Sequence, residues 1–401
     1  MLKPSDAWAL LEENLRPLGD EIVPRLEATG RCLRRDLEAT VDMPQADVSA
    51  MDGYIVAGGV GAGDVLEVVG TAAAGRPAEF TVPPGSAAKI MTGAVVPAGG
   101  DRVVPIEQTD GGDERVRIDV APVDGAHIRR GGEVVRRGGP LLAAGTVLTP
   151  GAVSLLASHG YAEVPVARRP TVAAMATGDE VVPASAEPAP GQLRDSNTTF
   201  LRSAGRTLGL GVESLGIAGD SREALRERIG VGLRSDVLML CGGVSKGEFD
   251  LVEDVLGELG CRRLFDAVAI QPGKPMVASV HGGGWVFGLP GNPASVMVTF
   301  WLYVAPFLRR LQGLPDGYWH RPVVAELGAP LPRTKGRDRF LAAEVTFEDG
   351  RLIATPLPPA GSHDVVVYGY GNALVRAPKL RPETPRGAAC EVLLLGDPLA
   401  S

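Results

Sequence analysis

The chain has 401 residues and carries 40 Lys and Arg against 48 Asp and Glu, which gives a net charge of −8. Its 53 glycines and 33 prolines exceed average usage but stay below the roughly 25–30% at which low-complexity disorder is expected. Hydrophobic residues make up 45% and aromatic residues 5% of the chain. We therefore expect a folded, turn-rich protein, and the acidic balance with few aromatic residues argues against nucleic acid as a partner.

The length predicts two to four domains. The sequence shows neither an apolar signal core at its start nor a run of about 18 apolar residues, so we expect a cytoplasmic protein without membrane contact. The four cysteines lie far apart without a Cys-x-x-Cys pair, which disfavours a disulfide framework and a zinc site; they are Cys32, Cys241, Cys261 and Cys390.

The first half of the chain changes from helical to β-like patterns. Apolar residues at helical spacing predict a helix that begins at Ser5-Asp6 and ends near Gly19. From about 41 to 149, short β-like runs alternate with glycine and proline turns, and strands are predicted at 65–69, 87–91, 102–106 and 115–120.

From Pro170 onward, buried strands alternate with helices. Strands are predicted at 171–176, 212–217, 236–240, 263–270 and 285–288, and helices at 198–208, 221–233, 250–259 and 292–311. This alternation is typical of βαβ units with a mainly parallel sheet, whose ligands bind beyond the carboxyl ends of the strands. The last segment returns to β runs at 323–327, 340–347, 351–356, 373–376 and 390–395, which predict a small separate β domain.

The most informative loop runs from Gly242 to Asp250, after a hydrophobic strand. Gly242 and Gly243 let the backbone approach a phosphate, Ser245 supplies a hydroxyl, and the next helix begins at Asp250. A tight turn with an acidic cap is the alternative. Gly243-Val-Ser245-Lys-Gly247 also fits the nucleophile elbow of serine hydrolases, with His281, His320 and His363 as partners, but too many residues separate Ser245 from the apolar part of the helix.

Three further loops occupy strand ends in the α/β region. They contain Glu180 after the first strand, Lys274 in a stiff Pro-Gly-Lys-Pro turn, and Asn292 as a natural cap before Pro293. Outside this region, Asp52 lies between apolar neighbours and Thr92 follows a strand. Each of these segments could be ordinary turn chemistry, but four polar loops at one edge of one sheet favour a ligand site.

Seven collinear segments resemble motifs of the molybdopterin molybdenumtransferase family, the MoeA and gephyrin E-domain proteins. They are Asp47-Val-Ser-Ala-Met-Asp-Gly-Tyr54, Ile90-Met-Thr-Gly-Ala94, Ala176-Thr-Gly-Asp-Glu180, Arg194-Asp-Ser-Asn197, Gly242-Gly-Val-Ser-Lys-Gly-Glu-Phe-Asp250, Gln271-Pro-Gly-Lys-Pro275 and Leu289-Pro-Gly-Asn-Pro-Ala-Ser295. The resemblance covers nearly the whole chain in the family's order, which makes the set specific although no single motif is.

The resemblance implies a multidomain fold of class α/β plus all-β. A central three-layer α/β molybdopterin-binding domain would take residues 170–315, and a small C-terminal domain similar to a β-barrel would take 316–401. The N-terminal region, 1–169, would comprise a helical linker domain I, at about 1–45 and 141–169, and a β-rich domain II at about 46–140. The resemblance also implies an elongated homodimer, whose cleft lies between the α/β domain of one subunit and the β domains of its partner. Other cofactor-biosynthesis proteins are implied as further partners.

The implied activity is insertion of molybdate into adenylyl-molybdopterin with release of AMP, in the presence of Mg²⁺. By matching position, the catalytic residues would be Asp52, Glu180, Asp250 and Lys274, with Glu180 and Asp250 holding the metal, since Mg²⁺ prefers carboxylates and phosphate oxygens. The substrate-binding residues would be Thr92, Gly93, Asp195, Ser196, Asn197, Gly242, Gly243, Ser245, Gly273, Pro290, Gly291, Asn292 and Ser362.

The chain departs from the family pattern at two places. Val134 stands where the family usually has an acid, unless the preceding Glu133 substitutes for it. The tail at 361–366 reads Gly-Ser-His-Asp-Val-Val, where the family tends to have small residues and serine. Molybdate and tungstate thus both stay open as the oxyanion. The alternative function is a catalytically reduced paralogue that binds the pterin or a protein partner, and the less favoured one is a serine hydrolase that uses Ser245.

Overall fold

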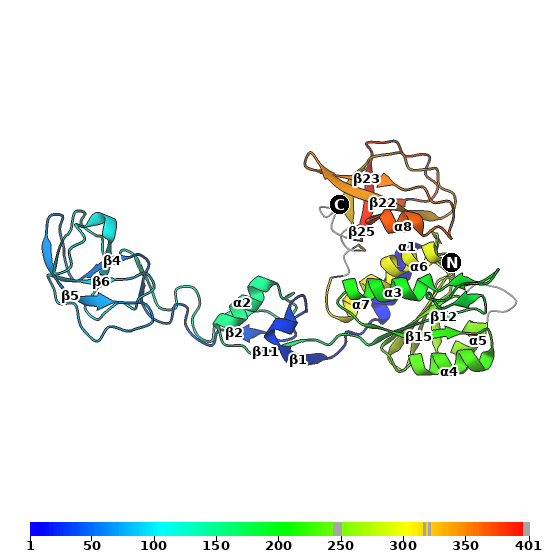
Figure 1. The fold of residues 1–401 in the computed structure, drawn as a ribbon, viewed down its shortest axis with the longest axis horizontal. Helices are drawn as coiled ribbons and strands as arrows, with labels where there is room; N and C mark the ends of the chain where they lie inside the picture. Colours follow the sequence, from blue (N-terminus) through cyan, green and yellow to red (C-terminus); the bar gives the residue numbers. More distant parts are fainter. Residues whose placement is uncertain (244–250, 316–317, 320–321, 396–401) are drawn as a thin grey trace. The chain divides into compact units, whose positions relative to one another are not determined.

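The computed structural model describes residues 1–243, 251–315, 318–319 and 322–395 (Figure 1). The chain forms two compact units: Met1–Glu21 with Ala167–Ser401, and Ile22–Val166. Each unit is described by itself. Within the described ranges, no helix has the length and apolar character that a bilayer span requires.

The larger unit contains a six-stranded sheet in the order β15-β12-β16-β20-β19-β17. Its strands are β12 (Val172–Thr177), β15 (Val212–Ala218), β16 (Val237–Cys241), β17 (Arg262–Phe265), β19 (Val277–His281) and β20 (Gly284–Leu289). The first four strands in the sheet order are parallel, and β19 is antiparallel to both of its neighbours. The mainly parallel sheet is confirmed.

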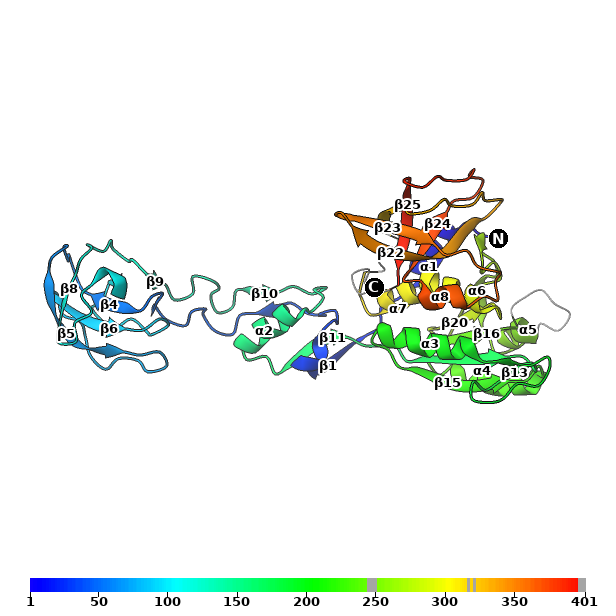
Figure 2. The same ribbon diagram turned by 45° about the horizontal axis from the view of Figure 1, so that its top comes forward.

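Helices cover both faces of this sheet (Figure 2). They are α1 (Pro4–Asn14), α3 (Ser196–Thr207), α4 (Arg222–Gly232), α5 (Leu251–Glu258), α6 (Pro293–Thr299) and α7 (Ala305–Leu311), the last two joined by the π-helical segment Phe300–Val304. Val172 and Ala174 of β12 share a core with α1, α3, α6 and α7, whereas Ala173 and Met175 pack with α4 and α5. Alternate residues of one strand therefore serve two layers of helices, and the α/β domain has three layers.

Two details of this unit differ from the predictions. The strand expected at 263–270 divides into β17 and β18 (Ile270–Gln271), because Leu2 bridges Val268 between them, and β19 was not predicted. Residues 1–21, expected with the N-terminal region, cluster with the larger unit, since Ala7, Trp8 and Leu11 are buried in its core.

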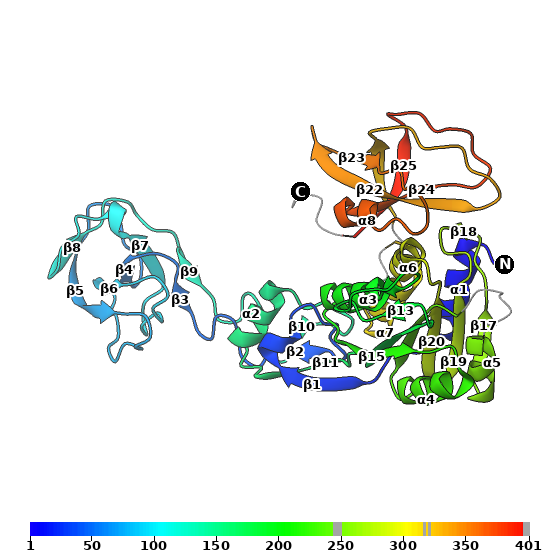
Figure 3. The ribbon, with the colours of Figure 1, turned by 45° about the vertical axis from the view of Figure 1, so that its right-hand side comes forward.

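The C-terminal strands of the same unit form a closed barrel (Figure 3). They are β21 (Val323–Leu327), β22 (Asp338–Glu348), β23 (Arg351–Pro356), β24 (Ala373–Ala377) and β25 (Ala389–Leu394), with the short helix α8 (Val366–Tyr370). The order β22-β23-β21-β25-β24 closes because β24 also pairs with β22. β18 adds to the start of β22, in parallel, so the barrel is joined to the α/β domain by main-chain hydrogen bonding. The barrel-like C-terminal domain is confirmed.

The smaller unit is rich in β-structure. Its main sheet has the order β7-β4-β6-β5-β8, with β4 (Gly53–Val56), β5 (Val65–Ala72), β6 (Ser86–Ile90), β7 (Arg102–Pro105) and β8 (Arg115–Arg117). Three two-stranded pairs accompany it: β1 (Asp20–Pro24) with β11 (Glu163–Ala167), β2 (Leu37–Glu38) with β10 (Pro140–Leu142), and β3 (Val48–Ser49) with β9 (Ile128–Arg129). The helical segments are α2 (Pro150–Ser158) and the 3₁₀ turns Arg25–Ala28 and Ile106–Gln108.

The inner strand β4 was not predicted from the sequence, in which this segment was interpreted as a turn or part of a ligand site. β4 pairs with β6 on one side and β7 on the other. It begins at Gly53, where a Cβ would lie 2.0 Å from the carbonyl oxygen of Val104. The glycine therefore permits a close strand approach and does not mark a turn.

We predict that a partly buried ion pair stabilises the barrel. The guanidinium of Arg376 lies 2.8 Å from the carboxylate of Asp338, whose residue is 4% exposed. Arg376→Ala would leave this carboxylate buried without its cation, so the free energy of unfolding should fall by about 3 kcal/mol, measured by urea titration. Arg351→Ala is the control, because Arg351 pairs with Glu326 at the barrel surface, and we expect little change. Equal losses in both variants would contradict the prediction.

Candidate functional site

A cavity of about 570 Å³ lies beyond the carboxyl ends of β12 and β16, in the larger unit. We call it the acidic cavity, because the carboxylates of Glu180, Asp195 and Asp220 line it. Its other walls include Gly178, Arg194, Ser196, Asn197, Gly242, Gly243, Gly291, Asn292, His363 and Val365. The structure thus brings together eight of the predicted site residues at the expected edge of the sheet.

Two glycines leave part of the main chain that lines this cavity uncovered by side chains. Gly242 has a φ of +98°, and a Cβ there would lie 2.9 Å from the carbonyl oxygen of Thr177. Gly243 has a φ of +62°, and its Cβ would lie 2.4 Å from a methyl group of Val252. A side chain at either position would be strained and would clash, so these turns require glycine. The main chain is therefore accessible to a ligand where a side chain would otherwise shield it.

Two predicted binding residues have structural partners. The carboxylate of Asp195 accepts a hydrogen bond from the backbone N–H of Thr198 at 2.9 Å and so caps α3. The Asn197 side chain donates to the carbonyl oxygen of Gly291 at 2.8 Å, which links the start of α3 to the loop after β20. Both residues thus shape the cavity wall as well as face it.

Asn292 is the residue whose predicted role changes most. It stands at the N-cap position of α6, as expected, but its side chain makes no capping bond. The amide donates instead to the hydroxyl of Ser362 at 3.0 Å. Pro290 is buried and lines neither this cavity nor the one described next, so its contact with substrate stays a prediction.

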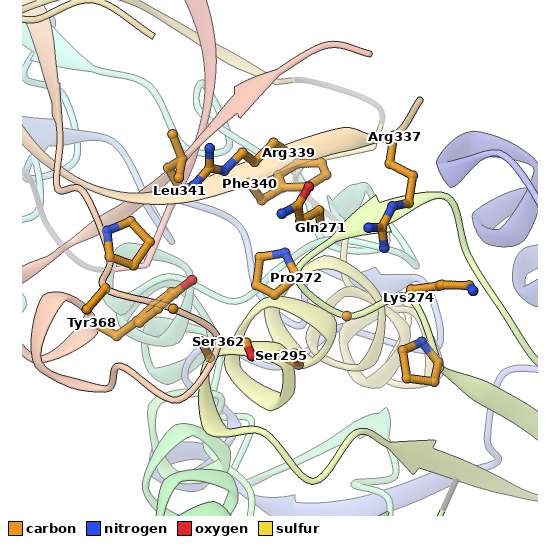
Figure 4. Close-up of a pocket in the computed structure, with 16 residues that line it drawn as sticks. Gln271, Pro272, Lys274, Ser295, Arg337, Arg339, Phe340, Leu341, Ser362 and Tyr368 are labelled. Carbon is orange, nitrogen blue, oxygen red and sulfur yellow. The ribbon is translucent and has the colours of Figure 1, made fainter. Parts of the chain in front are cut away.

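A second cavity, of about 500 Å³, lies where the α/β domain meets the barrel (Figure 4). We call it the cationic cavity, because Lys274, Arg337 and Arg339 line it. Its other walls include Gln271, Pro272, Gly273, Ser295, Ser362 and Tyr368. The sequence predicts Lys274 and Gly273 at the same edge of the sheet as Glu180; they line this cavity, together with Ser362, and not the acidic one.

The cationic cavity is shaped by a tight turn and a neutral hydroxyl. Gly273 has a φ of +101°, and a Cβ there would lie 2.7 Å from a methyl group of Thr299. Burial raises the pKa of the Tyr368 hydroxyl, so this group stays protonated. Three cationic side chains with hydroxyl groups nearby suit a small oxyanion.

Several residues that line the two cavities were not predicted from the sequence. Asp220 follows β15 as Glu180 follows β12, so the same strand-end criterion applies to both. Arg337 and Arg339 flank Asp338 at the start of β22, and this alternation places both arginines on one face of the strand. His363 was considered only as a partner of Ser245.

Asp52 and Thr92 lie together in the smaller unit. The backbone N–H of Thr92 donates to the carboxylate of Asp52 at 2.6 Å. This bond and one from the Thr92 hydroxyl lower the pKa of Asp52. Gly93, with a φ of +80°, continues the turn, and its N–H donates to the carbonyl oxygen of Ser49. The two motifs are thus structurally coupled.

The departure at Val134 also falls in the smaller unit. Val134 is 70% exposed. The neighbouring carboxylate of Glu133 accepts a hydrogen bond from the backbone N–H of Arg130 at 2.8 Å. The Glu133 side chain therefore stabilises the turn formed by residues 130–133.

Two predicted residues, Ser245 and Asp250, lie outside the described residues, as does His320. For the serine-hydrolase alternative, His363 lines the acidic cavity, whereas His281 pairs with Gly284 at the opposite edge of the sheet. Among residues 1–243, 251–315, 318–319 and 322–395, no three His, Cys, Asp or Glu side chains cluster as a metal site would require. Glu180 and Asp220 nevertheless offer the carboxylate oxygens that Mg²⁺ prefers when phosphate oxygens complete its shell.

Three family models together match most of the chain. The MoeA N-terminal region (domain I and II) matches residues 2–160, a probable molybdopterin binding domain matches 173–310, and the MoeA C-terminal region (domain IV) matches 324–395.

Individual proteins give the same result. Molybdopterin molybdenumtransferase 2 of Mycobacterium tuberculosis is 35% identical over 398 residues, covering 96% of this chain and 97% of the relative. The molybdopterin molybdenumtransferase of Nostoc sp. is 39% identical over 312 residues, covering 74% and 71%. A crystal structure of the molybdopterin biosynthesis MoeA protein from Pyrococcus horikoshii has a TM-score of 0.83 and 30% identity, covering 99% of this chain and 100% of that one.

We predict that the Asp52 carboxyl titrates below the ordinary value of about 3.9, because two Thr92 donors favour its charged form. Thr92→Ala keeps the N–H bond and removes the hydroxyl, so the midpoint should rise part of the way back. Carboxyl ¹³C NMR against pH measures both. The pKa of Asp52 is lower in the folded protein than in the unfolded chain, so the charged carboxylate stabilises the smaller unit at pH values above the unfolded pKa. This stabilisation is lost as the pH falls through the folded pKa. Met91→Ala should leave the midpoint unchanged; an ordinary midpoint in the parent chain would contradict the assignment.

Proposed function

The chain belongs to the MoeA family of molybdopterin biosynthesis proteins, and on that premise we propose that it is a molybdopterin molybdenumtransferase. It inserts molybdate into adenylyl-molybdopterin and releases AMP. The observation that carries the proposal is the similarity along almost the full length to proteins of that name. The two neighbouring cavities of opposite charge support it, because the reaction joins a nucleotide-bearing substrate to an oxyanion.

The acidic cavity suits the adenylylated pterin. Its bare glycine turns at Gly242 and Gly243 let a phosphate approach the main chain. Mg²⁺ would be held by Glu180 with Asp250, as the family motifs imply, and Asp220 is a further oxygen donor on the same wall. The ion, when bound, would neutralise charge on the phosphate as AMP leaves. The residues of the chain bind and orient the substrate around it.

The cationic cavity suits molybdate. Lys274, Arg337 and Arg339 supply positive charge, and Ser362 supplies a hydroxyl. This assignment combines Lys274 of the α/β domain with the barrel residues Arg337, Arg339 and Ser362. Tungstate has the same shape and charge, so this donor set accepts either ion.

Several finer assignments stay predictions. They are the four-domain division, the homodimer with cleft residues from both subunits, the cytoplasmic location and further biosynthetic partners. The catalytically reduced paralogue is the second candidate function, because Val134 stands where the family usually has an acid. Incubation of the pure protein with adenylyl-molybdopterin, Mg²⁺ and molybdate separates the two. Pterin binding without AMP release would favour the paralogue, and labelling of Ser245 by a fluorophosphonate would favour the hydrolase.

We predict that the carboxylates are required for AMP release. Glu180→Gln and Asp250→Ala should each lower the rate at least about 100-fold, because each removes a charge that holds the metal beside the phosphate. Raising the Mg²⁺ concentration should partly restore Glu180→Gln. Glu187→Gln, an exposed carboxylate outside the cavity, is the control and should release AMP at the parent rate. Parent rates in both test variants would remove these carboxylates from the mechanism.

We also predict that Lys274 acts on the oxyanion. Lys274→Ala should raise the molybdate concentration for half-maximal rate about tenfold, because a charge-assisted hydrogen bond is worth roughly 1.5–3 kcal/mol. Pterin binding should be unaffected, since Lys274 does not line the acidic cavity. Lys335→Ala, an exposed lysine outside both cavities, is the matched control. A change in pterin affinity instead of molybdate dependence would refute the assignment.

A further inference from the structure

One barrel loop, residues 359–365, forms part of the wall of both cavities. Ser362 lines the cationic cavity and His363, the next residue, lines the acidic cavity. Pro359, Ala360 and Gly361 accompany Ser362, whereas Val365 accompanies His363. We call this segment the wall loop. Successive side chains of the wall loop therefore meet two chemically different environments.

The wall loop is held at both ends by its own aspartate. The two carboxylate oxygens of Asp364 accept hydrogen bonds from the backbone N–H groups of Ala360 and Val366, each at 2.9 Å. These bonds lower the pKa of Asp364, so the carboxylate stays charged and the turn stays closed at neutral pH. The hydrogen bonds that Asp364 accepts thus stabilise the wall loop.

The α/β domain fixes the middle of the wall loop. The side chain of Asn292 donates to the Ser362 hydroxyl at 3.0 Å, and the backbone N–H of Ala294 donates to the Ser362 carbonyl oxygen at 3.2 Å. A Cβ at Gly361 would lie 2.8 Å from Cε1 of His363, so the imidazole folds back over a position without a side chain. His363 is thereby confined on a loop that is anchored at both ends and in its middle.

We propose that His363 is a substrate-binding residue of the acidic cavity, where its imidazole N–H donates a hydrogen bond to a phosphate oxygen of the nucleotide. This inference rests on the proposed function. Carboxylates dominate the cavity and, when ionised, only accept hydrogen bonds, whereas imidazole can donate to an anion in either protonation state. The charged groups that face it or neighbour it are Glu180, Arg194, Asp195 and Asp220 across the cavity and Asp364 on its own loop.

The test measures the affinity of the full chain for AMP by calorimetry in the presence of Mg²⁺. His363→Ala should weaken AMP binding about tenfold, the loss expected for one hydrogen bond to a charged group. His363→Gln retains an N–H donor and should recover most of the affinity. Circular dichroism melts establish that both variants are folded.

Two controls separate binding from loop shape. Val365→Ala lines the same cavity without a donor, and Tyr370→Ala removes an exposed side chain of the following helix that lines neither cavity, so both should bind AMP as the parent chain does. Parent affinity in His363→Ala, while the parent chain binds and releases AMP, would overturn this inference alone. Equal weakening in Ala and Gln variants would also overturn it. A parent chain that neither binds nor releases AMP would overturn the proposed function together with it.

Discussion

The pairing of β18 with β22 is the contact on which both cavities depend. Ile270 and Gln271 pair with Asp338 and Arg339 in parallel, and the N–H of Asp338 donates to the carbonyl oxygen of Ala269 at 3.1 Å. This short ladder places the start of β22 beside the Pro-Gly-Lys turn, so the arginines of the barrel and Lys274 line one cavity. The same seating brings the wall loop against the start of α6. Without the β18–β22 pairing, the acidic cavity would lose the wall that His363 and Val365 form, and the cationic cavity would lose the wall that the barrel residues form.

Much of the fold could be predicted because local pattern and final structure agree. The alternation of strands and helices after Pro170 predicted the parallel strands, and the barrel strands β21 and β23 have the bounds that their apolar pattern indicated. The failures involve partners that are distant in sequence. β4 begins with a glycine that a close strand approach requires, and the segment after Phe265 leaves the sheet because Leu2 pairs with Val268. Neither partner is visible from the local sequence.

Part of the candidate site likewise follows from the local sequence, and part depends on residues that are distant in the chain. The glycine turns and the strand-end acids follow from rules that act over a few residues, so Glu180, Gly242 and Gly243 were found. The sequence places Lys274 at the same edge of the sheet as Glu180, but Lys274 lines a separate cavity, because the position of the barrel decides which residues surround it. Arg337 and Arg339 are about 60 residues further along the chain, and only the strand pairing makes them neighbours of Lys274. Motif order identifies the participants, whereas tertiary pairing decides which of them act together.

The alternation of side chains along the wall loop constrains the length of this segment more than its composition. Ser362 and His363 face different cavities because they are consecutive, and both ends of the loop are tied by Asp364 and the middle by Asn292. Insertion or removal of a single residue would exchange the two side chains between the cavities or break one of these ties. Variation within this turn is therefore expected to take the form of substitutions, and its residue count sets a fixed spacing between the two cavities.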